Sequence, residues 1–422
     1  MPPPTNASRI RRDYLILLAL RWFPSGLIIP VLVLLPLQRG LSLGQLGVIM
    51  AIQGLTILCL EVPTGGAADT FGRRPVLLFA SAVNICSLLL FAFASSVAAF
   101  AVYFLIQGVY RALDSGPLDA WFVDSTLARD PDTSIERGLG LGGTVMSIAI
   151  GAGSLLSGLL VAVQPIPGVP GIVTPVVIAI VVRVIELGFV TVLLREEPRN
   201  RPERSGRDRP SVRFGRTVAS ATRLMTRSRV LICLLAVEIL WGFGMVSFET
   251  LTAVRLTAVT GDTEQIASLM GPLTAFAWIA SAAGAALIIP VAERVGTPLA
   301  AALMRVLQGL AVAAMALFGG LAGIITAFLA CYLVHGASNP LHNALLHRQV
   351  GTDERATVLS LNSMVSQPAA ALGLVTLTAL ADAISLSAAM VIGAIILAVA
   401  APLYLAARND RRPVTPQPAT TR

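Results

Sequence analysis

Lysine is absent from this chain, and charge of either sign is scarce. All 31 basic residues are arginine, and charged residues make up only 13% of the 422 positions. Hydrophobic residues reach 55% and the mean hydropathy is +0.79, so the chain carries far more apolar surface than one aqueous core can bury. The composition excludes an ordinary soluble protein and predicts one with many membrane spans.

Cysteine and histidine are also rare, with four and three copies. The cysteines fall in apolar runs without paired spacing, which predicts packing residues and neither disulfides nor metal ligands. The sequence has no Gly-Lys-Ser/Thr nucleotide loop and no zinc-protease helix, and no Ser-His-Asp spacing can be argued. It therefore favours a protein that is not an enzyme, that binds no metal or cofactor, and that does not pump by hydrolysing ATP.

Apolar runs of about 20 residues, the length that crosses about 30 Å of hydrocarbon as a helix, recur along the whole chain. We predict an all-α membrane protein with twelve spans, at residues 14–37, 44–68, 75–95, 98–124, 138–163, 171–194, 230–254, 266–291, 297–318, 320–347, 355–381 and 384–407. The first span is too long for a cleavable signal and lacks a small-residue cleavage site.

The arginines predict the orientation of these spans. Both termini and the even-numbered loops hold 25 of the 31 arginines, and only Arg39 and Arg255 fall on the opposite side. Because basic residues collect in cytoplasmic loops, we expect a multi-pass protein of the plasma (inner) membrane with both termini in the cytoplasm. The same rule accounts for the net charge of +8 without nucleic acid as a partner.

One long polar segment, residues 195–229, divides two halves of six spans each. The halves occupy residues 14–194 and 230–407, between tails of residues 1–13 and 408–422. They resemble each other, since residues 115–124 (SGPLDAWFVD) align with residues 338–347 (SNPLHNALLH), and Asp69 and Gly72 align with Glu293 and Gly296. Matches in chain order predict a duplicated unit, and hence two six-helix bundles related by pseudo-twofold symmetry.

The loop between the second and third spans carries a charged motif. Its members are Gly65, Asp69, Gly72, Arg73 and Arg74. Twelve spans, duplicated halves, a basic central loop and this motif together resemble the major facilitator superfamily of transporters. The resemblance implies two bundles around a central cavity, with alternating access by rocking. The motif departs from the family pattern at Thr70, where many members have a basic residue.

The motif predicts a charge cluster that we call the latch. Asp69 can pair with Arg73 or Arg74, and Asp124 at the cytoplasmic end of span four is a second possible partner. In the superfamily such a cluster holds the two bundles together on the cytoplasmic side and breaks when that side opens. The alternative is that the arginines only anchor the topology at the headgroups.

Span four predicts the site richest in charge. Ionisable groups at depth cost at least about 2.5 kcal/mol each, so Arg111, Asp114 and Asp119 must face protein, a cavity or the interface. Arg111 and Asp114 lie one turn apart and can pair, which leaves Asp119 to find another partner or to be protonated. A buried carboxyl that binds and releases a proton is what a proton-coupled carrier requires, and a structural ion pair is the alternative.

Seven more polar residues inside spans are candidates for proton coupling or substrate contact: Arg21, Arg183, Glu186, Glu238, His335, Asn339 and His342. Arg183 and Glu186 are spaced i, i+3, so we expect them to pair with each other. His342 replaces Asp119 in the repeat alignment, and an imidazole there can relay protons or serve only in polar packing.

Two transport functions follow as alternatives, both for a small-molecule substrate of a monomer in the bilayer. The first is efflux of amphipathic compounds, antibiotics included, driven by the proton gradient; it depends on the motif, the acids of span four and aromatic residues such as Trp121, Trp241 and Phe248. The second is import or facilitated passage of a polar or anionic metabolite, which would use arginines as anion ligands.

Asp69→Asn tests the latch. We expect this variant to insert and fold normally but to lose transport, because an exposed pair contributes only about 1 kcal/mol to stability while the latch needs its charge. Uptake into proteoliposomes measures transport, and the elution profile of the purified protein controls for folding. Transport at the wild-type rate would contradict the latch.

Overall fold

The structure, a computed structural model, describes residues 7–130, 133, 135–195, 228–350 and 355–409. Within these ranges the chain is helical and contains no strand. The predicted linker, residues 195–229, and the predicted C-terminal tail lie almost entirely outside them, whereas residues 7–13 of the predicted N-terminal tail belong to the first helix. The surroundings of Gly65 and Asp69 also lie outside the description.

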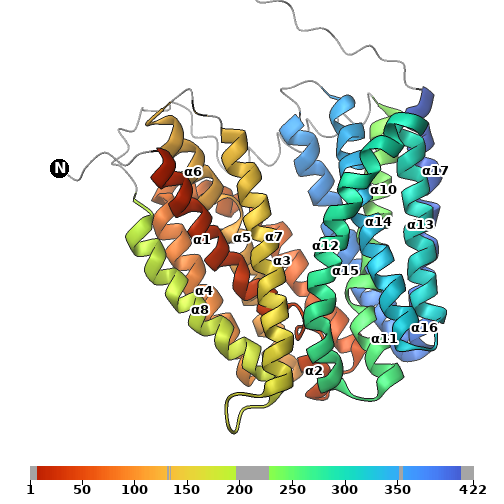
Figure 1. Cartoon of the computed structure of the whole chain (residues 1–422), viewed down its shortest axis with the longest axis horizontal. Helices are drawn as coiled ribbons and strands as arrows, with labels where there is room; N and C mark the ends of the chain where they lie inside the picture. The colour runs from red at the N-terminus through yellow and green to blue at the C-terminus, as the bar shows by residue number, and fades with distance from the viewer. Residues whose placement is uncertain (1–6, 131–132, 134, 196–227, 351–354, 410–422) are drawn as a thin grey trace, which may run out of the picture.

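The first six crossings form one bundle, red to yellow-green in Figure 1. They are α1 (Ala7–Ile28) with α2 (Leu34–Gln38), α3 (Leu43–Phe71), α4 (Arg73–Phe93), α5 (Val97–Asp114) with α6 (Pro117–Leu127), α7 (Ile135–Val163), and η1 (Gly171–Val173) with α8 (Thr174–Leu193).

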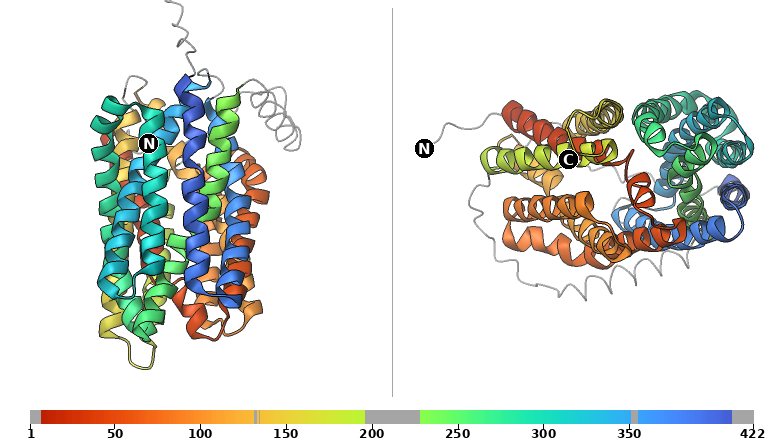
Figure 2. Two further views of the ribbon diagram at one scale, coloured as in Figure 1. Left: turned by 90° about the vertical axis from the view of Figure 1, so that its right-hand side faces the viewer. Right: turned by 90° about the horizontal axis from the view of Figure 1, so that it is seen from below.

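The last six crossings form the second bundle, green to blue, which lies beside the first in Figures 1 and 2. They are α10 (Arg229–Glu249) with α11 (Leu251–Thr260), α12 (Thr263–Val295), α13 (Thr297–Leu317), α14 (Leu321–Arg348), α15 (Arg355–Ala383), and α16 (Leu386–Val399) with α17 (Ala401–Tyr404) and η3 (Leu405–Asn409). The first and last helical turns of the described chain lie at the same end of the molecule (Figure 1).

Eleven of the crossings in the described part are long and apolar enough to span a membrane. The first crossing differs from the continuous helix predicted over residues 14–37, because α1 starts earlier, at Ala7, and ends at Ile28, and residues 29–33 form a turn before α2. Pro30 lies in this turn; it lacks a backbone N–H and restricts Ile29, so a helix tends to end before it.

The two bundles differ at one pair of positions that the repeat aligns. The fourth crossing breaks between α5 and α6 at Gly116, whose φ of 94° is left-handed, and Pro117 then starts α6. In the tenth crossing Asn339 occupies the matching place, and α14 runs straight through it and through Pro340. The break in span four therefore depends on a glycine that the second half lacks.

Another pair of aligned positions, a glycine in each half, supports the duplication. Gly72 joins α3 to α4 with a φ of 96°, and Gly296 joins α12 to α13 with a φ of 87°. Both connections turn the chain on one residue, a conformation that glycine adopts without steric cost.

Two helix pairs form most of the contact between the bundles, α3 with α15 and α7 with α12, and α2 and η1 add smaller contacts with α12. Gly44 N–H donates to Asp382 Oδ2 at 2.7 Å, and Gln164 Nε2 donates to Glu264 Oε2 at 2.9 Å. Both bonds lie at the end of the molecule away from the described termini, where the bundles lean together in Figure 1. Among the described residues, these hydrogen bonds between the bundles occur only at that end.

Glycine lets α7 and α12 approach closely. A Cβ on Gly271 would lie 2.5 Å from Ser154 O, and one on Gly158 would lie 2.3 Å from Ser268 O. Both clashes are with backbone, so a side chain at either position would push the two helices apart.

Gly271→Ala should therefore weaken this contact by about 1–3 kcal/mol, the usual cost of overpacking. We expect a longer distance between spin labels on cysteines placed at positions 164 and 264, measured by pulsed electron resonance in a background without native cysteines. Gly151→Ala is the matched control, since nothing lies within 4 Å of a Cβ there. Equal distances in the two variants would show that the contact does not set the spacing of the bundles.

Candidate functional site

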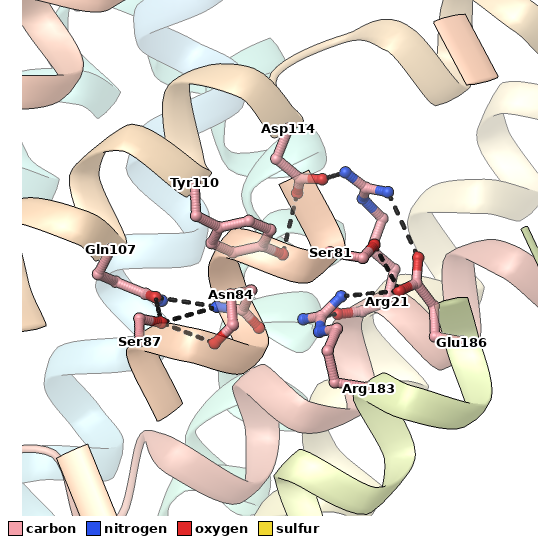
Figure 3. Close-up of polar contacts among 9 residues, drawn as sticks. All are labelled: Arg21, Ser81, Asn84, Ser87, Gln107, Tyr110, Asp114, Arg183 and Glu186. Atoms are coloured by element: carbon pink, nitrogen blue, oxygen red, sulfur yellow. Dashed lines mark hydrogen bonds and ion pairs between the residues drawn. The ribbon is translucent and has the colours of Figure 1, made fainter. Parts of the chain in front are cut away.

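Four charged side chains from three helices meet inside the first bundle (Figure 3). Arg21 comes from α1, Asp114 from the end of α5, and Arg183 and Glu186 from α8. The side chain of Asp114 is 10% exposed and the other three are at most 4% exposed. We call this group the N-bundle cluster. Two positive and two negative charges balance, which lowers the cost of burying them.

Arg21 bridges the two carboxylates of the cluster. Its guanidinium pairs with Asp114, and its Nη1 lies 3.6 Å from Glu186 Oε1. Arg183 Nη1 lies 3.7 Å from Glu186 Oε2, which confirms the pair expected from their spacing. The first, fourth and sixth crossings are thereby tied together by charge.

The predicted pairing of Arg111 with Asp114 is wrong. Tyr110 donates to Asp114 Oδ2 at 3.2 Å and Arg21 pairs with Oδ1, so both carboxylate oxygens already have partners. Arg111 instead places its guanidinium 5.4 Å from the ring centre of Trp22, a cation–π arrangement.

Neutral polar groups complete the cluster. Ser81 donates to Glu186 Oε2 at 2.7 Å, and Arg183 donates to the carbonyl of Arg21 at 3.1 Å while facing the ring of Tyr110 at 5.2 Å. Sequence reasoning missed Ser81 and Tyr110, because a serine or tyrosine in an apolar run gives no sign of its partner.

A polar triad adjoins the cluster (Figure 3). Asn84 Nδ2 and Ser87 Oγ both donate to Gln107 Oε1 at 2.9 Å. The triad links α4 to α5 and extends the polar interior of the bundle toward the end away from the described termini. None of its members was singled out from the sequence.

Asp119 is not buried, which corrects the prediction of a carboxyl in low dielectric. It is exposed in the first turn of α6 and accepts a hydrogen bond from Tyr14 at 2.8 Å. Because the chain breaks at Gly116, α6 starts anew and carries Asp119 away from the N-bundle cluster. Its partner is thus a tyrosine hydroxyl of α1.

The described part of the latch lies within the first bundle. Arg73 Nη2 lies 2.6 Å from Asp124 Oδ2, and Arg73 also donates to the carbonyl of Ala120. Arg74 donates to the carbonyl of Thr191 at 2.7 Å. These contacts tie the start of α4 to α6 and α8, so the action of the latch between the bundles stays a prediction.

The turn between α12 and α13, which aligns with the turn between α3 and α4, borders a cavity. Thr297 and Pro298 stand where the arginines of the first copy stand, and the space there is a cavity of about 570 Å³. Its wall includes Glu293, Arg348 and Arg408. The second bundle therefore keeps the turn of the repeat without its arginines.

A second buried polar group lies in the other bundle, and we call it the C-bundle cluster. His342 Nε2 lies 3.5 Å from Glu238 Oε2 and 3.1 Å from Asn362 Oδ1. His342 Nδ1 lies 2.9 Å from the hydroxyl of Tyr404. Arg305 donates to Gln308 at 2.7 Å and interacts electrostatically with Glu238. The structure thus brings together Glu238 and His342, two candidates that the sequence could not connect.

On α14, Asn339 lies about one turn and His335 about two turns from His342 of the C-bundle cluster, toward the middle of the helix. Asn339 Nδ2 is 3.5 Å from His335 Nε2, and the ring of His335 stacks on Trp241 with 5.7 Å between ring centres. His335 therefore belongs to an aromatic group and not to the C-bundle cluster. No set of three or more His, Cys, Asp or Glu in the described ranges is placed to hold a metal ion.

Comparisons with known proteins agree with this architecture. The family model described as Major Facilitator Superfamily matches residues 14–374. The crystal structure of the nucleoside transporter NupG is 14% identical, with a TM-score of 0.77 over 95% of this chain and 99% of that one. A bacterial homologue of the human lysosomal transporter Spinster, described as inward-facing and unoccupied, is 17% identical, with a TM-score of 0.76 over 97% of this chain and 98% of that one. Among curated proteins, none matches this chain.

The N-bundle cluster predicts a specific stability pattern. Glu186→Gln leaves two buried guanidiniums facing one carboxylate, and we expect it to cost about 3–5 kcal/mol. Adding Arg183→Gln restores the charge balance, so the double variant should be about 1–3 kcal/mol more stable than the sum of the single costs predicts.

Thermal unfolding of the purified protein in detergent measures these costs. Glu293→Gln is the control, because Glu293 is exposed and lies outside the cluster. If the double variant loses as much stability as Glu186→Gln and Arg183→Gln lose together, Glu186 and Arg183 do not interact as described.

Proposed function

This chain belongs to the Major Facilitator Superfamily, and from that membership we propose that it exports amphipathic small molecules in exchange for protons. It is a membrane transporter and not an enzyme. The proposal adds the coupling ion, the direction and the chemical class of substrate.

The contacts between the bundles support alternating access. The bundles touch through α3 with α15 and α7 with α12, and the hydrogen bonds between described residues of the two bundles lie at one end. With both termini in the cytoplasm of a plasma membrane, as we propose for a monomer, that end is the external one and the molecule opens inward. A carrier must then exchange these contacts for others at the opposite end.

The pair of Arg21 and Asp114 carries the proposal of proton coupling. Asp114 is the last residue of α5, two positions before the break at Gly116. A proton on Asp114 removes the charge that holds Arg21 to this helix and leaves Arg21 with Glu186 alone. The protonation state of one carboxyl thus alters the tie between α1 and the hinge of the fourth crossing, which is the kind of coupling a proton-driven carrier needs.

The same contacts favour an amphipathic substrate over an anionic one. Arg21 and Arg183 are engaged by carboxylates of their own bundle, so they have less capacity to bind a substrate anion. The alternative function is import of a polar or anionic metabolite. Arg111 could bind such an anion, because it forms no ion pair with any described residue. NupG, a nucleoside transporter, illustrates that this fold also serves polar solutes.

Asp114→Asn and Asp119→Asn distinguish the two acids of span four. Purified protein in proteoliposomes that contain a pH-sensitive dye should move protons when an exported compound is added. We expect Asp114→Asn to abolish this proton flux, because the amide cannot carry the proton, and Asp119→Asn to keep it, because Asp119 is exposed and bonded only to Tyr14.

The compounds for this proteoliposome assay are chosen by testing a panel of toxic compounds on cells with and without the gene. Greater susceptibility of cells without it supports export. Proton flux in Asp114→Asn at the wild-type rate would refute the coupling role, and flux lost in Asp119→Asn alone would move that role to Asp119.

A further inference from the structure

Glu249, in the second bundle, is a carboxylate that pairs with no other described residue. Glu249 is the last residue of α10, where the seventh crossing breaks before α11. It is exposed, whereas Phe248 and Thr250 on either side of it are buried. Among the described residues it forms no hydrogen bond or ion pair, unlike Asp114, Glu186 and Glu238.

An ionisable residue within a crossing costs several kcal/mol to bury, about 2.5 at the least, unless it has a partner or meets water. The N-bundle cluster avoids this cost by pairing. Glu249 forms no such pair with a described residue, so its exposed carboxylate is available to a charged ligand.

Aromatic rings gather beside this carboxylate. The ring of His335 has its centre 5.7 Å from that of Trp241, 5.8 Å from that of Phe248 and 6.0 Å from that of Tyr332. Tyr332 lies within electrostatic reach of Glu249. These four rings come from α10 and α14, and we call them with Glu249 the aromatic-acid group.

Two polar atoms of the group lack partners as well. Trp241 Nε1 and His335 Nδ1 are buried without a hydrogen bond in the described part of the chain. Each such atom costs about 1–3 kcal/mol, which is unusual for a purely structural core. Arg305 approaches the ring of Trp241 at 6.0 Å, but it donates to Gln308 and interacts with Glu238, so its charge is already engaged.

We propose that the aromatic-acid group binds an organic cation, with Glu249 as the counter-charge and the rings as the surface on which the cation lies. A carboxylate attracts a cation strongly where water is scarce. Each contact of the cation with an aromatic face adds about 0.5–2 kcal/mol. The inference depends on the proposed function, since it narrows the exported amphipathic compounds to lipophilic ammonium or phosphonium ions.

Tetraphenylphosphonium and tetraphenylborate test the sign of the charge, because the two ions have nearly the same shape. Equilibrium dialysis of the full-length purified protein should show that the wild type binds the phosphonium at least about tenfold more tightly than the borate, a difference of about 1.4 kcal/mol. Glu249→Gln should remove this preference, and Glu249→Asp, which keeps the charge, should retain most of it.

Glu293→Gln is the matched control, because Glu293 is an exposed acid of the same bundle that lies at the end of α12. Trp241→Leu should weaken binding of the phosphonium severalfold and should not strengthen binding of the borate. Thermal unfolding of Glu249→Gln shows whether this variant folds normally. Binding by Glu249→Asp provides a second test, because that variant keeps the charge.

The proposal is overturned if the wild type binds both ions equally, or if Glu249→Gln binds the phosphonium as the wild type does. Transport of another exported compound by Glu249→Gln separates this outcome from failure of the proposed function. If that compound still drives proton flux, the carrier stands and only its cation site is refuted. If the wild type moves no compound at all, the proposed function fails even where the phosphonium binds.

Discussion

The ion pair of Arg21 with Asp114 is the contact on which the first bundle depends. A guanidinium at depth in a membrane protein is tolerated only where carboxylates neutralise it, and Arg21 has two of them. Because these carboxylates come from α5 and α8, the requirement for neutrality fixes the relative positions of three crossings. Most packing between membrane helices is apolar and weakly directional, so this charge network gives the bundle a specific arrangement that small side chains alone would not.

Under the proposed coupling, the same pair lets a tightly tied bundle respond to a proton. Asp114 has a partner on each oxygen, yet it sits beside the left-handed Gly116, where the helix has already ended. Removing its charge would weaken the tie between α1 and the end of α5. A carboxylate in the middle of an unbroken helix, such as Glu186 in α8, would pass the change to a whole helix instead.

The sequence was sufficient for much of the fold and for little of the site. Most span positions and the repeat follow from local composition, and the pair of Arg183 with Glu186 follows from spacing on one helix. Partners on different helices do not, because they depend on how the helices rotate and cross. This is why Arg111 was assigned the wrong partner, and why Glu249, one of several charges inside spans, could not be ranked above the others.

The duplicated halves differ in how their buried charges are arranged. The first bundle holds a balanced set of four charges around Arg21. The second keeps one comparable group around His342 and adds four rings beside an acid without a partner. A carrier has to close around its substrate and also sense the ion that drives it, and a single unit optimised for both would compromise one of them. Under the proposed function, the first bundle binds the proton at Asp114 and the second binds the substrate beside Glu249, while the two remain in contact mainly through α3 with α15 and α7 with α12.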